Sequence, residues 1–314
     1  MDNQAKSAPS IRVWQEIAGR TLPGTNLWTG FRAFLGRFHR RSKVGLYAGF
    51  FVLSLCLAAI GAPIIAPYNP AKQDLRSALQ APSHGHLLGT DELGRDVLSR
   101  LIFGARVSLQ VGMIAVSIAL VLGVTWGLIA GFWGGWVDTV LMRFADALQS
   151  FPLLVLAIGI TAAFGASLTN AMVATGLVFT PTFVRLTYGQ VLSVREREFV
   201  LAARAMGAGN ARIMLYHLLP NITTPLIVQA TLNIAFAILF EAGLSFLGFG
   251  AQPPTPAWGS MLRTGYPYLE LAPWLAISPG AAIFIAVMAF NFFGDGLRDT
   301  LDPSLQRFDA AGKS

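Results

Sequence analysis

Three ionisable side chains interrupt long apolar runs of this sequence: Asp146, Arg185 and Glu241. An ionisable group in hydrocarbon is strongly unfavourable unless it is paired or wetted, so each one marks a brace between helices or a polar path. Asp146 and Arg185 lie at matching distances from the ends of their runs, and we hypothesise an ion pair that braces two helices. The alternative is a local pair between Arg143 and Asp146, with Arg185 extending toward the membrane surface.

Catalytic chemistry has little support. The chain has only four histidines, and no Ser-His-Asp arrangement or pair of carboxylates suited to acid–base catalysis emerges. The ending Gly312-Lys313-Ser314 resembles part of a phosphate-binding loop, but Arg307 stands where that loop requires glycine. We therefore expect no catalytic residues, no cofactor and no nucleotide site in this chain.

A metal site has equally weak support. His84 and His86, with Asp91 and Glu92 nearby, could form one. Two histidines two positions apart in a flexible loop make a weak chelate, so we expect no metal. Cys56 is the single cysteine, which excludes disulfides within the chain.

The composition indicates a membrane protein with several spans. Of 314 residues, 54% are hydrophobic and 12% are charged, whereas a soluble domain averages about 25% charged residues. The net charge of +7 would suggest a nucleic-acid partner in a soluble protein. Here the basic residues flank apolar runs, so we expect membrane lipid headgroups as their partners and no nucleic acid.

Six apolar runs reach the roughly 17 to 25 residues that a helix needs to cross a bilayer. They cover residues 44–66, 107–130, 137–164, 171–194, 222–249 and 274–293. We therefore expect an all-α, polytopic protein with six transmembrane helices, kinked at Pro152 and Pro181. Small residues should allow these helices to pack closely: Gly123, Gly127, Gly131, Gly159 and Gly165.

Both ends of the chain are expected in the cytoplasm. Residues 1–43 form a basic tail, residues 44–305 the transmembrane domain and residues 306–314 a second tail. Apolar residues over 27–38 recur at helical spacing between arginines, which favours a helix lying in the membrane interface. A disordered tail is the alternative. An N-terminus inside places most Lys and Arg on the cytoplasmic side, as the positive-inside rule requires.

One hydrophilic segment, residues 195–221, separates the fourth and fifth apolar runs. Its charges and loop backbone would have no partners in hydrocarbon, so the segment must lie in water. Glu198 favours the positive end of a helix, and Ala202 and Ala203 favour helix formation. Gly207 permits a left-handed turn that ends this helix.

A second short helix is expected over residues 210–219, with Pro220 marking the start of the next span. The resulting helix-turn-helix on the cytoplasmic side is suited to docking, because small residues let a partner approach closely. The alternative is an interfacial loop that only links two spans.

The same segment resembles the EAA loop through which bacterial ATP-binding-cassette importer permeases engage their ATPases, at Glu198, Ala202, Ala203, Gly207, Leu219 and Pro220. Other stretches resemble the C-type permease of the dipeptide, oligopeptide and nickel importer family: HLLGTDELGRD at residues 86–96, EAGLSFLG at 241–248 and NFFGDGLRD at 291–299. The resemblance extends over roughly residues 44–305. His217 departs from it, because many such permeases have an aliphatic residue there.

The resemblance implies a permease subunit in a bacterial inner membrane, with several partners. A B-type permease would form a heterodimer with it, two ATPase subunits would dock from the cytoplasm, and a binding protein would deliver a peptide substrate outside. Closure of the ATPases would push on the EAA segment, and rigid helices would convert that motion into alternating access.

Some alternatives remain open at this stage. Glu241 could bind the amino group of a peptide, or it could accept hydrogen bonds from neighbouring helices or the outer loop. The substrate could be a dipeptide, an oligopeptide, nickel or another solute. A self-contained secondary transporter would show an inverted repeat, which we do not find, and a structural scaffold would not explain the outer-loop motifs.

Overall fold

Four helices are long and apolar enough to cross a membrane in the computed structural model, which describes residues 35, 36 and 38–301. They are α3 (Lys43–Ile60), α5 (Val97–Trp133), α11 (Leu219–Phe246, continuous with the segment from Asn210) and α13 (Trp274–Leu301). The described residues contain no β-strand, only one isolated bridge. Most of the expected interfacial helix and the whole C-terminal tail lie outside the described residues.

The third apolar run is not one continuous helix. It forms α6 (Gly135–Gln149) and α7 (Leu153–Phe164), which meet at 90°. Pro152 precedes α7 and lacks the amide hydrogen that would continue the helix from α6. The kink expected at Pro152 is therefore a complete break, and counting the pair as one broken span raises the number of candidate spans to five.

The fourth run forms α8 (Leu168–Val194), which is less apolar than the other long helices. Its threonines at 175, 180 and 187 are buried against the protein rather than exposed to lipid. Thr175 and Thr180 donate hydrogen bonds to carbonyls one turn back, which removes the penalty of burying a hydroxyl. Pro181 lies inside this helix without ending it.

Glycines allow α5 and α8 to pack backbone against backbone. A Cβ at Gly127 would lie 2.6 Å from Thr187 Cβ, and one at Gly131 would lie 2.8 Å from Val191 Cγ1. A Cβ at Gly123 would lie 2.4 Å from Phe183 Cβ. Gly159 has no atom near its missing side chain. The expected close packing is confirmed at the three α5 positions and not at Gly159 or Gly165, where an added Cβ would have no atom within 4 Å.

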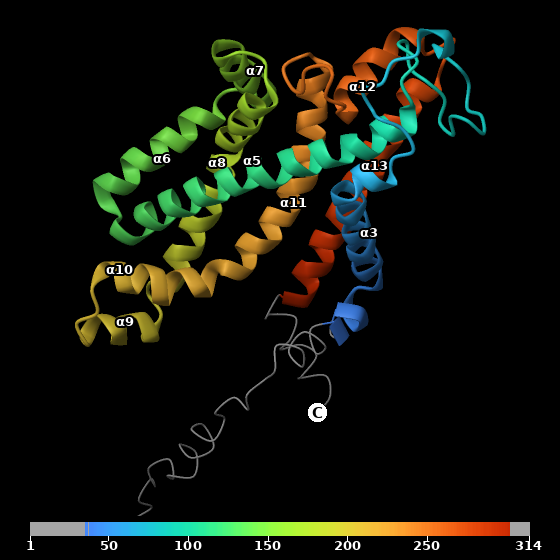
Figure 1. Ribbon diagram of the computed structural model, residues 1–314. Helices are drawn as coiled ribbons and strands as arrows, with labels where there is room; N and C mark the ends of the chain where they lie inside the picture. The colour runs from blue at the N-terminus through green and yellow to red at the C-terminus, as the bar shows by residue number, and fades with distance from the viewer. Residues whose placement is uncertain (1–34, 37, 302–314) are drawn as a thin grey trace, which may run out of the picture.

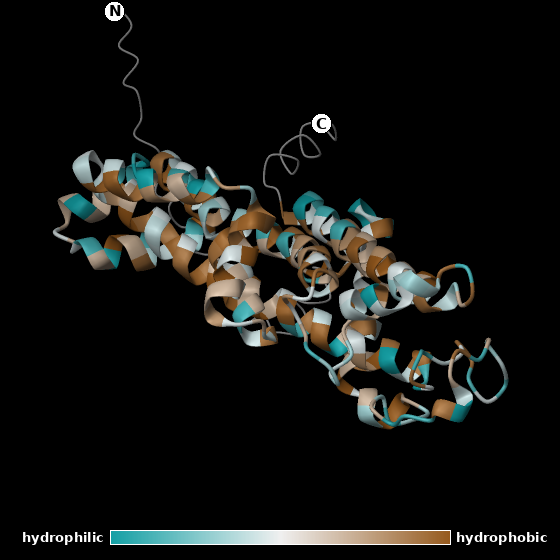
Figure 2. Ribbon diagram, turned by 90° about the horizontal axis from the view of Figure 1, so that it is seen from above, coloured by the Kyte–Doolittle hydropathy of each residue, from teal (hydrophilic) through white to brown (hydrophobic). Residues whose placement is uncertain are grey.

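Helix α5 crosses the other long helices from the outer loops to α6 (Figure 1). It contacts α8, α11 and α3, and its buried face contributes to two hydrophobic clusters on either side of α11. Figure 2 shows hydrophobic residues (brown) over much of the long helices, with hydrophilic residues (teal) interspersed and prominent in the loops. The apolar faces not buried inside the chain are those that lipid or partner subunits would cover.

Shorter elements connect the spans. We use the names first and second outer loop for the two connections that are expected on the outer side of the membrane. The first carries α4 (Ala62–Ile65) and a 3₁₀ turn (Leu75–Ser77), and the second carries α12 (Trp258–Gly265) and a 3₁₀ turn (Tyr266–Tyr268). Helix α5 begins at Val97, ahead of its apolar run, because the Asp96 side chain accepts a hydrogen bond from the Ser99 amide at 2.8 Å. Trp258 fastens α12 to this end of α5 by donating to the Leu101 carbonyl at 2.9 Å.

Candidate functional site

The hydrophilic segment begins with α9 (Glu198–Ala205), which has Glu198 in its first turn and Arg204 in its last. These charges complement the helix dipole. Gly207 follows with φ +82°, and the Ala208 amide donates to the Ala203 carbonyl at 3.0 Å. The left-handed glycine therefore ends α9, as the sequence predicts.

The second part of the segment differs from the expectation of a separate helix. Helix α10 (Asn210–Arg212) is short and passes into a π-helical stretch (Ile213–Leu218) that continues directly into α11. Leu219 and Pro220 lie in the first turn of α11, with no turn separating them from the stretch before. A displacement of α10 would therefore move α11, which is long enough to cross a membrane. The π-helix between them is a locally wider helical turn, and such turns are often found at functional sites.

Buried contacts fasten this segment to the bundle. Val200, Ile213 and Leu218 are buried in the hydrophobic cluster that also holds the end of α8, and Ala203 is buried as well. The Arg195 guanidinium donates to the Gly131 carbonyl at 2.8 Å, which ties the start of the segment to the end of α5. The segment is thus held against two long helices rather than hanging from one loop.

The opposite face of the segment is exposed and partly apolar. Glu198 and Ala202 are exposed there, and the large exposed hydrophobic residues are Phe199, Leu201, Met206, Leu215 and Tyr216. We call these five side chains the apolar docking face. Large exposed apolar side chains that are rimmed by polar residues mark a site of interaction with a protein or with a membrane.

Asp146 and Arg185 are brought together by α6 and α8. The Arg185 Nη2 donates to Asp146 Oδ1 at 2.7 Å, so the hypothesised interhelical contact is present. Tyr188 adds a second link between the same helices by donating to Asp138 at 2.8 Å. In the described part of the chain, Asp146 forms no ion pair with Arg143. The pair is about half exposed, at 53% for the Arg185 side chain and 49% for that of Asp146.

Glu241 lies apart from these residues and is fully buried. Its carboxylate accepts hydrogen bonds from Ser245 at 2.5 Å and from Ser108 of α5 at 3.3 Å. Ser245 in turn accepts from the Ala251 amide at 3.1 Å. Glu241 therefore joins α11 to α5 and, through Ser245, to the outer loop, and this geometry favours hydrogen bonds within the protein over a substrate amino group.

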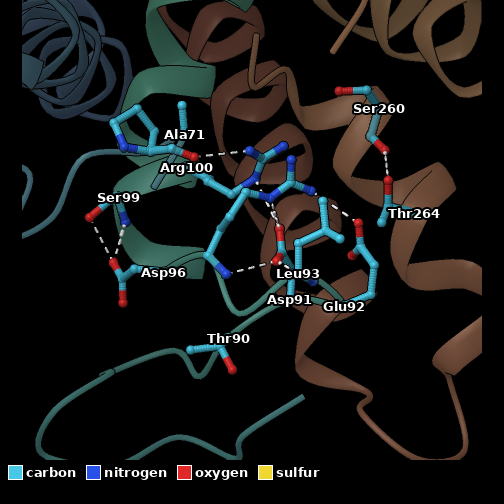
Figure 3. Close-up of polar contacts among 12 residues, drawn as sticks. Ala71, Thr90, Asp91, Glu92, Leu93, Asp96, Ser99, Arg100, Ser260 and Thr264 are labelled. Atoms are coloured by element: carbon cyan, nitrogen blue, oxygen red, sulfur yellow. Dashed lines mark hydrogen bonds and ion pairs between the residues drawn. The ribbon is translucent and has the colours of Figure 1, made fainter. Parts of the chain in front are cut away.

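A polar cluster in the first outer loop joins residues that the sequence offered only as weak metal ligands or as part of a family motif. Asp91 Oδ2 lies 2.6 Å from Arg95 Nε and 3.4 Å from Arg100 Nε, and the Arg95 Nη2 donates to Glu92 at 3.0 Å (Figure 3). Arg100 also donates to the Pro70 carbonyl at 3.1 Å. The cluster braces the first outer loop against the start of α5. Its signal in the sequence is the spacing of opposite charges in DELGRD at residues 91–96.

One carboxyl group of this cluster has a shifted pKa. Burial, followed by the neighbouring Asp91 carboxylate, raises the pKa of Glu92 above its usual value. His86 lies beside Asp96, with 2.9 Å between Nδ1 and Oδ1, and not in the Asp91–Arg95 group. Of the four residues weighed as a metal site, His86 therefore contacts Asp96, whereas Asp91 and Glu92 contact Arg95.

A cavity of about 520 Å³ lies between α8, α11 and α13. Its polar lining residues are Gln190, Thr224, Gln229 and Arg298, and its other lining residues are apolar. These residues come from three separate helices, so no local pattern in the sequence could reveal them as neighbours. The cavity lies toward the ends of α8 and α13 and the start of α11, which is the end of the bundle that carries α9.

The chain matches known protein families over most of its length. The family described as binding-protein-dependent transport system inner membrane component matches residues 123–307, and the N-terminal TM domain of oligopeptide transport permease C matches residues 31–82. A chain of the MetNI methionine ABC transporter, solved in inward-facing conformations, has the same fold, with a TM-score of 0.53 and 20% identity over 64% of this chain and 96% of that one.

Several curated proteins are much more similar in sequence. The dipeptide transport system permease protein DppC of Alkalihalophilus pseudofirmus is 45% identical, covering 85% of this chain and 88% of its own. The di/tripeptide transport system permease protein DppC of Pseudomonas aeruginosa is 46% identical, covering 84% and 89%. The glutathione transport system permease protein GsiD of Pectobacterium atrosepticum is 41% identical, covering 94% and 100%.

Proposed function

Because the chain belongs to the family of binding-protein-dependent transport system inner membrane components, we propose that it is the C-type permease of an ATP-binding-cassette importer that brings di- or oligopeptides into the cell. The identity of 45% and 46% to two permeases named for dipeptides and di/tripeptides, over most of both chains, carries the peptide assignment. Glutathione, named for a third relative, is itself a tripeptide and falls in the same class.

The proposed topology has six crossings with both termini in the cytoplasm. Helices α3, α5, α11 and α13 supply the first, second, fifth and sixth crossings. The broken α6–α7 pair supplies the third crossing, and α8 supplies the fourth. Helix α8 falls short on hydropathy because its polar side chains are buried against α5, where lipid does not reach them. Residues 44–305 would then form the transmembrane domain between two cytoplasmic tails, 1–43 and 306–314.

The proposed partners follow from this role. Members of this family work with a solute-binding protein and with ATPase subunits, and we assign two ATPases, an extracytoplasmic binding protein and a B-type permease to this chain. The exposed face that carries Asp146 and Arg185 is one that the B-type permease could cover, and their ion pair would then brace α6 against α8 beside the shared solute path.

The coupling segment would transmit the work of the ATPases. Glu198 and Ala202 are exposed beside the apolar docking face, where an ATPase would bind, whereas Ala203 is buried, and Val200 packs α9 into the hydrophobic cluster. Leu219 and Pro220 lie where the segment becomes α11. A push on α9 would tilt α11 and α8 together, because the segment is packed against both. No covalent step is needed in this subunit.

Two neighbouring glycines give the sharpest test of this function. Gly207 has φ +82°, so Gly207→Ala should strain the end of α9 by roughly 1–2 kcal/mol. Gly209 has φ −67° and open space around it, so Gly209→Ala is the matched control. In a reconstituted importer, G207A should lower the peptide-stimulated ATPase rate and ATP-driven uptake of a labelled dipeptide, and G209A should not.

Other results would contradict the proposal. Uptake by the purified chain without ATPase subunits would indicate a self-contained transporter. If a complete importer accumulates nickel and no peptide, its substrate is nickel rather than a peptide.

A further inference from the structure

Polar groups from three helices converge on the cavity between α8, α11 and α13, and the proposed transport function does not yet use it. Its volume of about 520 Å³ lies within the 300–1,000 Å³ of typical small-molecule sites. In the proposed orientation it lies in the cytoplasmic half of the bundle, close to the coupling segment. A solute leaving the permease would pass this level last.

Arg298 supplies the only charge in the cavity wall. Its guanidinium forms no ion pair or hydrogen bond with any other residue, as far as the structure describes the chain. No carboxylate lines the cavity to neutralise it. Arg298 is exposed at the wall of the cavity. A guanidinium there that has no partner within the protein favours an anion, and its planar fork matches a carboxylate in particular.

The remaining polar groups suit peptide bonds. Gln190 and Gln229 each present an amide that can both donate and accept a hydrogen bond. The Gln229 amide makes only a long contact, 3.4 Å, to Asn233, whose own amide nitrogen is buried without a partner in the described chain. Leu186, Val228 and Leu232 supply apolar wall for side chains.

From these groups we propose that the cavity is an exit subsite for short peptides, in which Arg298 binds the C-terminal carboxylate and the two glutamines bind the peptide backbone. The inference rests on the proposed peptide transport and assigns its substrate contact on the cytoplasmic side. An anionic lipid headgroup would use the guanidinium but would leave the amide groups without partners, so the peptide fits the whole lining better.

The test uses the permease heterodimer with its ATPases in nanodiscs, without nucleotide and without binding protein, so that only the permease can bind. The probes are tritiated dialanine and its C-terminal amide, which lacks the carboxylate. The wild type should bind dialanine about tenfold more tightly than the amide, as the loss of one charge-assisted contact predicts. Arg298→Gln should bind both probes alike, at the affinity of the amide.

Two further variants separate the contact from folding and from general charge. Arg298→Lys keeps the positive charge and should retain part of the preference for dialanine. Lys43→Gln removes an exposed positive charge at the same end of the bundle but outside the cavity, and it should behave as wild type. Binding of the amide by Arg298→Gln shows that its cavity is folded.

Three outcomes would overturn the inference. They are a wild type that does not bind dialanine, an Arg298→Gln variant that keeps the preference, and Arg298-dependent retention of phosphatidylglycerol that dialanine does not displace. The last result would assign the site to lipid. If the complete importer still takes up dialanine with ATP, only this inference fails, and if it takes up no peptide, the proposed function fails as well.

Discussion

Glu241 has no solvent exposure, and its two carboxylate oxygens accept hydrogen bonds from Ser245 and Ser108. A buried acceptor of this kind fixes the relative position of the helices that supply its donors. Because Ser245 also holds the Ala251 amide, the same group sets the position of the second outer loop. Glu241 is thus best understood as a positioning residue.

Replacing this carboxylate should have graded effects. Glu241→Ala leaves two hydroxyls without their acceptor and should destabilise the protein by about 1–3 kcal/mol, whereas Glu241→Gln keeps one acceptor oxygen and should be milder. Thermal unfolding of the purified heterodimer measures both. Glu270→Ala, which removes an exposed carboxylate, is the control. A Glu241→Ala protein as stable as wild type, but defective in peptide binding, would favour the substrate interpretation instead.

The ion pair between Asp146 and Arg185 makes a second prediction. Asp146→Arg and Arg185→Asp each place like charges where 2.7 Å now separates opposite ones, so each should reduce the amount of assembled importer. The double exchange restores attraction and should recover assembly and uptake. Arg143→Asp, on the same helix but outside the pair, should have little effect. A double variant no better than the singles would remove the bracing role.

Contacts between two side chains could be predicted from the sequence only where one quantity, such as depth in the membrane or spacing along the chain, linked the two positions. Matching depth in the membrane was enough to bring Asp146 and Arg185 together. Arg298 and Gln190 share no such quantity, because their meeting depends on how α8 and α13 pack against α11. The Asp91–Arg95 contact has a local spacing that could have been used, whereas the approach of Arg100 to the same carboxylate depends on the fold of the outer loop.

Among the helices, the α5–α8 interface depends most on its side-chain sizes. Gly127→Ala would put a methyl group 2.6 Å from both Thr187 Cβ and the Val184 carbonyl oxygen, neither of which can move without its backbone. This overpacking should destabilise the protein by about 1–3 kcal/mol. Gly159→Ala on α7 meets no atom and should be neutral or stabilising. Unfolding temperatures of the two variants compare them directly, and equal temperatures would refute the close packing.

The helices themselves were largely predictable from the length of apolar runs. Hydropathy summed over a window does not depend on the direction of the helix axis, however. It could therefore not distinguish a straight helix over 137–164 from α6 and α7 meeting at 90°. It also could not show that α10 continues through a π-helical stretch into α11, because Pro220 is compatible with both a chain break and the first turn of a helix.

At the scale of the whole molecule, α5 connects the two ends of the permease. Its 37 residues span about 55 Å at 1.5 Å per residue, more than the thickness of the hydrocarbon core. One end is held by Asp96 and the outer polar cluster, and the other accepts the Arg195 hydrogen bond from the coupling segment. A single helix therefore links the segment that carries α9 to the loop that precedes Val97.

The central claim is that the segment from α9 to α10 is a cytoplasmic surface held by a separate ATPase. Cys56 is the only native cysteine, so Cys56→Ser provides a background in which one new cysteine reports its own location. Met206→Cys places the reporter on the apolar docking face at a side chain that is 82% exposed, and Leu87→Cys, at 62% exposed, places the control in the first outer loop.

Labelling these cysteines with a membrane-impermeant maleimide is the most direct measurement. The account predicts that Met206→Cys reacts only in inverted vesicles and is protected when the ATPase subunits are bound, whereas Leu87→Cys reacts only in spheroplasts. Reaction of Met206→Cys from the outside, or equal reaction with and without the ATPases, would contradict it.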